Sequence, residues 1–150
     1  KPGLTWAQQE QVRVGHLLVA WTAKAIWALL SVSCYFLLEN PLPGWMWVQP
    51  EIVEIWKEDG VVLIETVFQQ FGAAYIKSTG LLSNLPYVWW LSASADMEAG
   101  RVPLRGQMWW QGQYVFRTKV AEPYPPLFGM AVAMVVQISF DGQEDCSNAA

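Results

Sequence analysis

The sequence predicts an α+β domain in which N-terminal helices pack on a curved, four-stranded antiparallel sheet that forms a cone. Apolar residues recur at helical spacing in the first part of the chain, and beyond Pro86 they recur at strand spacing. Helices followed by antiparallel strands are the order typical of α+β folds. The 150 residues fit a single domain, 1–150, in which we expect 1–6 and 141–150 to be flexible ends.

The composition is unusually apolar. Hydrophobic residues make up 53% of the chain and charged residues 15%, against about 25% charged in an average domain. This predicts a large core, an apolar surface, or both. The chain has ten Trp, and two pairs of neighbours among them, Trp89-Trp90 and Trp109-Trp110, fall in predicted strands. Because neighbours in a strand point to opposite faces, we expect one Trp of each pair in the core and the other facing outward or a partner.

The first helix is predicted to start after Thr5, with Gln8 as its capping-box partner, and to run to Leu38. The apolar run 16–38 has the length of a membrane span. Lys24 lies inside it, and a central lysine costs about 2.5–3.5 kcal/mol on insertion scales. We therefore predict a buried helix of a soluble domain, with a span over 17–38 as the alternative.

A second helix is predicted to start at Pro50, because proline suits the first helical turn. The spacing of apolar residues over 61–78 favours another helix that ends at Gly80. An alternative makes 52–56 and 61–66 a hairpin, because both segments are rich in β-branched residues. The sequence leaves open which of the two holds over 51–66.

The predicted strands follow in the second half of the chain. Gln111-Gly112 is the turn of a hairpin, and in the last strand both faces are apolar, which favours a central strand. The four segments are 87–95, 104–110, 113–121 and 129–140.

The chain offers little catalytic chemistry. Its one histidine, His16, lies on an apolar helix, and no pattern of a metal site or a phosphate loop is present. Asp96 and Glu98 are candidate general bases, but their turn context favours solvated acids that stabilise a loop. Glu65 is the other candidate, and an outward-facing position explains it equally well. We predict no catalytic, metal or cofactor-binding residue.

The charge of the chain argues against one class of function, and its two cysteines indicate none. A net charge of −4 without a basic run argues against nucleic-acid binding. The one close basic group is interpreted as a solvated sheet face, and it comprises Arg101, Arg105, Arg117 and Lys119. Cys34 and Cys146 have no metal-ligand spacing, and whether they pair stays open.

Residues 88–120 resemble the periplasmic domain of the DotI/IcmL/TraM family of type IVB secretion and conjugation inner-membrane proteins. The resemblance lies in Ser92-Ala93, in Leu104-Arg105, and in Gly112 followed by Tyr114 and Phe116. It implies an NTF2-like cone, self-association, and a scaffold role at the periplasmic face of the inner membrane. It also implies a membrane-spanning helix upstream of Lys1, and no catalytic residue.

Two functions follow as hypotheses. The first is a non-catalytic interaction domain of a secretion or conjugal transfer apparatus that binds copies of itself and other apparatus proteins. Its predicted contact residues are Trp109, Trp110, Arg105 and Arg117. The alternative is an NTF2-like protein or enzyme, of the isomerase or dehydratase type, whose cone binds a small apolar ligand.

Overall fold

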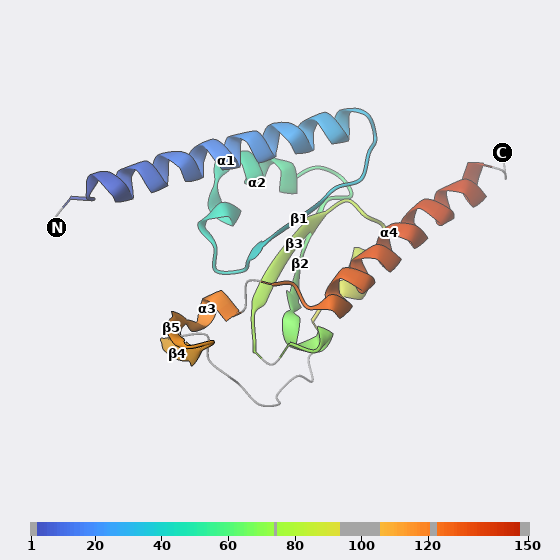
Figure 1. Cartoon of the computed structure of the whole chain (residues 1–150). Helices are drawn as coiled ribbons and strands as arrows, with labels where there is room; N and C mark the ends of the chain where they lie inside the picture. The colour runs from blue at the N-terminus through green and yellow to red at the C-terminus, as the bar shows by residue number, and fades with distance from the viewer. Residues whose placement is uncertain (1–2, 74, 94–105, 121–122, 148–150) are drawn as a thin grey trace.

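A three-stranded antiparallel sheet lies between two layers of helices (Figure 1). The computed structural model describes residues 3–73, 75–93, 106–120 and 123–147. The strands are β1 (Leu37–Pro41), β2 (Val62–Val67) and β3 (Ser78–Ser83), in the order β1-β3-β2. The predicted α+β class is confirmed, but neither the NTF2-like cone nor a four-stranded sheet is.

Helix α1 (Trp6–Ser31) starts as predicted. The Thr5 hydroxyl accepts a hydrogen bond from the backbone N–H of Gln8 at 3.3 Å, and the Gln8 side chain accepts one from the Thr5 N–H at 2.9 Å. The helix ends at Ser31 and not at Leu38. Ser33 adopts φ 55°, which breaks the helix, and the next residues pair with β3 as strand β1.

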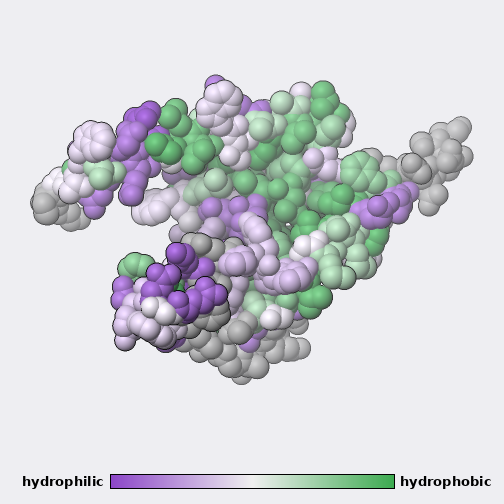
Figure 2. All heavy atoms as spheres, in the orientation of Figure 1, coloured by the Kyte–Doolittle hydropathy of each residue, from purple (hydrophilic) through white to green (hydrophobic). Residues whose placement is uncertain are grey.

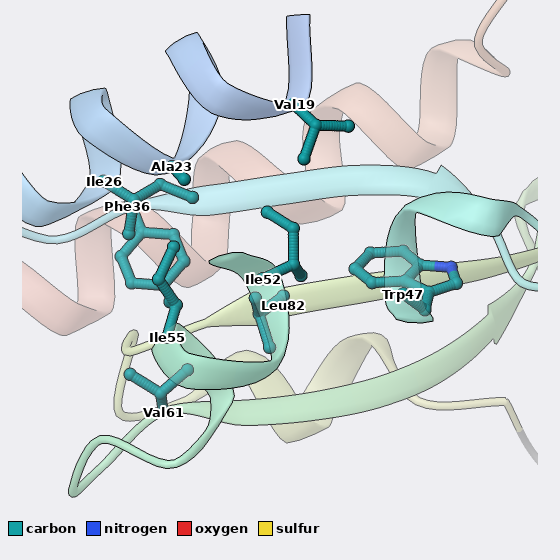
Figure 3. Close-up of a cluster of buried hydrophobic side chains, with 9 residues drawn as sticks. All are labelled: Val19, Ala23, Ile26, Phe36, Trp47, Ile52, Ile55, Val61 and Leu82. Carbon is teal, nitrogen blue, oxygen red and sulfur yellow. The ribbon is translucent and has the colours of Figure 1, made fainter. Parts of the chain in front are cut away.

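The first helical layer consists of α1, the 3-10 helix η1 (Trp45–Val48) and α2 (Pro50–Trp56), which starts at Pro50 as predicted. Figure 3 shows side chains of α1 pointing toward α2 and the sheet. The buried cluster consists of Val19, Ala23, Ile26, Phe36, Trp47, Ile52, Ile55, Val61 and Leu82.

The second layer covers the opposite face of the sheet. It contains the 3-10 helices η2 (Phe68–Phe71) and η3 (Val88–Leu91) and the long helix α4 (Pro126–Ser147). Its buried cluster consists of Ile64, Phe68, Leu81, Leu85, Val88, Leu91, Phe128 and Val135. Leu81 and its neighbour Leu82 therefore serve different cores, as the strand period of two requires.

The helix predicted over 61–78 is wrong. Residues 62–67 form the edge strand β2, which pairs with β3 from Val62↔Ser83 to Val67↔Ser78. Both faces of this strand are covered, so apolar residues occur at odd and even positions alike. This run therefore resembles the apolar pattern of a helix. Of the alternative hairpin, the second segment is a strand as proposed, whereas the first is helix α2.

The strand predicted over 129–140 is also wrong, because this segment lies inside α4. Among the described side chains of α4, the buried ones are Phe128, Val135 and Ser139, a spacing of seven and four that only a helix places on one side. The helix continues to Ser147, beyond the start of the predicted flexible end.

The strand predicted over 87–95 is replaced, within the described residues up to 93, by the helical turn η3. Its spacing of three buries Val88 and Leu91 and leaves both Trp89 and Trp90 more than half exposed. The expectation that one Trp of this pair enters the core therefore fails.

The predicted hairpin is confirmed, although it is shorter. Strands β4 (Gln107–Trp110) and β5 (Gln113–Phe116) pair around Gln111 and Gly112. Both turn residues have positive φ, 47° and 83°, as in the common two-residue hairpin turn. Arg117–Val120 is a helical turn, α3, and not strand. The hairpin is a separate two-stranded sheet and does not extend the main one.

Candidate interaction surfaces

The side of α1 that faces away from the core carries large apolar residues. Leu18 is 61% exposed and Trp21 is 69% exposed, in a helix that buries Val19 and Ala23 on its other side. We call this surface the outer stripe, and it consists of Val14, Leu17, Leu18, Trp21 and Leu29. Figure 2 shows hydrophobic residues gathered over the middle and C-terminal parts of α1.

The predicted burial of this helix is therefore wrong. Only 17% of its most apolar 18-residue window is buried. Within the part of the chain that the structure describes, α1 is the one helix long and apolar enough to cross a membrane by length and composition. A long apolar helix that lies on a surface leaves its outer side without a cover.

The charged residues of α1 are locally satisfied. Arg13 and Glu10 form an ion pair at 2.6 Å, and the hydrogen bond from Arg13 lowers the pKa of the Glu10 carboxyl. The Lys24 ammonium lies 5.6 Å from the ring centroid of Trp21. These long side chains can keep their charges in water while their stems cover apolar surface.

A groove lies beneath the N-terminal half of α1, where this helix extends past the sheet (Figure 1). The groove has a volume of about 520 Å³ between α1 and η1. It is lined by Val12, Gly15, His16, Leu18, Val19, Trp45, Met46 and Gln49. The exposed His16 is therefore at the edge of an open groove and not in a closed catalytic pocket.

The hairpin presents an aromatic face that includes one predicted contact residue. Trp109 is 62% exposed, and its ring meets that of the cross-strand partner Tyr114 edge-on at 5.0 Å. Phe116 lies on the same face, two residues beyond Tyr114, and is also exposed.

The other predicted contact residues are only partly placed. Arg117 is half-buried at the start of α3, whereas Arg105 lies outside the described residues. Trp110 belongs to β4 by its backbone, and its side chain lies outside the described ones. The structure thus brings Trp109 together with Tyr114 and Phe116.

The candidate acids and thiols form no common site among the described residues. Asp96, Glu98 and Arg101 lie outside those residues, and Glu65 is exposed on the edge strand β2. Cys34 is an exposed free thiol, and the side chain of Cys146 is outside the described ones. In the described part of the chain, no three His, Cys, Asp or Glu residues gather as they would around a metal ion.

A polar cluster of Glu39, Lys77 and Tyr124 links the sheet to the segment before α4. Glu39 and Lys77 are half-buried, and Tyr124 is exposed. The Tyr124 hydroxyl donates to Glu39 Oε2 at 2.7 Å, and Lys77 Nζ lies 3.7 Å from Glu39 Oε1. The same ammonium lies 4.7 Å from the ring centroid of Phe68. Burial, then the hydrogen bond to Glu39 and its charge, raises the pKa of Tyr124 to about 12. The cluster holds the segment before α4 against β1.

This cluster makes stability sensitive to alkaline pH. A folded-state pKa of about 12 for Tyr124 exceeds the ordinary value of about 10, so folding favours the neutral hydroxyl. Its contribution is complete below about pH 10 and is lost as the pH rises to about 12. Urea unfolding at a series of pH values should show a steeper alkaline loss in the natural protein than in Tyr124→Phe. Tyr75, whose pKa burial also raises, is common to both proteins. Equal slopes would contradict the role assigned to Tyr124.

No family model matches the chain, and comparisons with curated proteins and with solved structures also find no match. Function is therefore inferred from the surfaces described above.

Proposed function

We propose that this chain is a non-catalytic interaction module that lies on a membrane surface through the outer stripe of α1. The observation that carries this proposal is that α1 is apolar on both its core side and its exposed side. The exposed side of a surface helix is ordinarily polar. A contiguous exposed apolar surface indicates contact with a membrane or another protein.

The packing of α1 favours a helix that lies in the interface over one that spans the bilayer. Val19, Ala23 and Ile26 are buried against α2 and the sheet, so the C-terminal part of α1 cannot leave without opening that core. The free part, 6–18, is about 20 Å long at 1.5 Å per residue. The hydrocarbon core of a bilayer is about 30 Å thick.

The side chains of the outer stripe suit the boundary between lipid and water. Interfacial helices bury their apolar side about 5–10 Å deep, and Trp is enriched at that level. Trp21 of the outer stripe is 69% exposed, and Trp6, in the first turn of α1, is 78% exposed. With a net charge of −4, the protein has no general attraction to anionic lipids, so apolar burial drives the association.

The aromatic face of the hairpin supports a second contact, with protein. Trp109, Tyr114 and Phe116 are large exposed anchors of the kind that dominate contact energies. A scaffold role in a secretion or conjugation apparatus, with self-association at the periplasmic face of the inner membrane, remains our prediction from the resemblance of residues 88–120. The NTF2-like cone that goes with this resemblance likewise remains a prediction.

Vesicle binding tests the membrane contact. We expect the chain to sediment with phosphatidylcholine vesicles, and the double variant Leu17→Glu/Trp21→Glu to bind at least tenfold more weakly. Both side chains are exposed, so the variant should fold normally, and two carboxylates in the interface oppose insertion. Adding salt should change the binding little, because charge attraction does not drive it.

The matched control is Met130→Glu/Met134→Glu, which places the same charges at the same spacing on the exposed side of α4. This variant should keep the binding of the natural chain. Equal binding by the natural chain and the α1 variant, or no binding by either, would overturn the proposal. A dimer that only the α1 variant loses, without vesicle binding, would assign the outer stripe to a second copy.

A further inference from the structure

We propose that the groove between α1 and η1 binds a single hydrocarbon chain that carries an uncharged or weakly polar head group. The inference rests on the proposed function only for the source of this chain. Leu18 belongs both to the outer stripe and to the lining of the groove, so the groove opens beside the surface proposed to meet lipid. Figure 2 shows this part of α1 as hydrophobic.

The groove exists because α1 parts from the rest of the protein at Gly15. Four residues later, Val19 is buried against the core, but a Cβ added at Gly15 would have no atom within 4 Å. Gly15 also lines the groove, and glycine is unfavourable inside a helix. The missing side chain therefore leaves open space that a larger residue would fill.

The size of the groove favours a narrow ligand. Its volume of about 520 Å³ lies within the range of small-molecule sites, roughly 300–1,000 Å³. The stretch of α1 that lines the groove, from Val12 to Val19, is only about 10 Å long. A flexible single hydrocarbon chain can follow a groove this short.

The lining favours a hydrocarbon. Among the described residues that line the groove, none is charged, and Val12, Val19 and Leu18 form its α1 side. Met46 lies opposite, and methionine adapts to irregular apolar shapes. A charged head group would have no partner of opposite sign in this lining.

Two residues of the lining, Gln49 and His16, are polar and are suited to contact the head group. The Gln49 side-chain amide is held in place because it donates to the Trp45 carbonyl at 3.0 Å. His16 presents an exposed imidazole, which offers one donor and one acceptor when neutral. A hydroxyl, an ester or a protonated carboxyl matches this set.

Binding of the methyl ester of cis-parinaric acid, a fluorescent polyene without a charged head group, kept below its solubility limit, tests the groove. We expect saturable binding of one molecule per chain and competition by dodecanol. Gly15→Leu should weaken binding at least tenfold, because leucine occupies the space above Gly15. Gly129→Leu is the matched control: Gly129 is an exposed glycine of α4 with no atom within 4 Å of its Cβ position, and its variant should bind as the natural chain does.

A second variant keeps the test decisive if Gly15→Leu fails to fold. Trp45→Ala removes one of the side chains that line the groove. Because Trp45 is 84% exposed, the variant should bind several-fold more weakly without loss of stability. Binding by a folded Gly15→Leu or Trp45→Ala chain that equals that of the natural one would overturn the inference. Non-saturable binding by the natural chain would do so as well.

Two further experiments identify the source of the ligand and test the groove independently of the proposed membrane contact. Recovery of one monoacylglycerol per natural chain, but none per Gly15→Leu chain, after incubation with vesicles that contain it assigns the bilayer as source. Competition by dodecanol without recovered lipid assigns a free amphiphile. Leu17→Glu/Trp21→Glu should bind the methyl ester normally even though it loses vesicle binding, so failure at the outer stripe is distinguishable from failure at the groove.

Discussion

Phe68→Ala is expected to lower the free energy of unfolding by about 3–5 kcal/mol. The Phe68 side chain is fully buried, at 0% exposure, in the core between the sheet and α4. Its ring centroid lies 4.9 Å from that of Phe128 and 5.7 Å from that of Tyr124. Alanine would leave a cavity and remove the ring that faces the Lys77 ammonium.

Urea unfolding followed by circular dichroism measures this loss. Because domains of this size are stable by about 5–15 kcal/mol, the variant should unfold at a much lower urea concentration. Phe116→Ala is the matched control, since this phenylalanine is 63% exposed on the hairpin, and its loss should stay within about 0.5 kcal/mol. A loss below about 1 kcal/mol for Phe68→Ala would contradict the packing of α4 on the sheet.

Gly80→Ala is expected to destabilise the protein by about 1–3 kcal/mol, although alanine ordinarily improves a glycine position. Gly80 lies in the central strand β3, where the ring of Trp47 packs directly on it. A Cβ at this position would come within 2.8 Å of Trp47 Cζ2. The indole cannot move away freely, because it is 8% exposed and its Nε1 donates to the Pro41 carbonyl at 3.0 Å.

The same substitution at Gly15 should have the opposite sign. No atom lies within 4 Å of a Cβ there, so Gly15→Ala is expected to stabilise α1 by up to about 1 kcal/mol. Thermal and urea unfolding of the two variants in parallel checks both signs. A neutral or stabilising Gly80→Ala would mean that Trp47 does not lie against β3.

Local features were predictable from the sequence. The cap of α1 depends on Thr5 and Gln8, and the start of α2 depends on Pro50. The hairpin turn depends on Gln111 and Gly112. Each of these is set by residues only a few positions apart, so the sequence pattern contains the whole cause.

The exchange of helix and strand between 62–67 and 126–147 was not predictable in the same way. Strand β2 is covered on both faces, and α4 is apolar on its exposed side as well as on its buried side. In β2 only Glu65 marks an exposed position, and residues 126–136 of α4 include no polar side chain. Such short apolar runs do not distinguish a period of 2 from one of 3.6. Only pairing with β3, and packing of α4 on the far face of the sheet, decides between the two.

The candidate surfaces were likewise predictable from the sequence only in part. Sequence analysis identified Trp109 as a contact residue and α1 as a long apolar helix. It placed that helix inside the protein, whereas Leu18 and Trp21 are exposed, and it did not anticipate the groove above Gly15. The sequence by itself determined the composition, the caps and the turns of this protein, because these depend on near neighbours. Only the tertiary structure decided which apolar sides are covered, because coverage depends on segments that are distant along the chain.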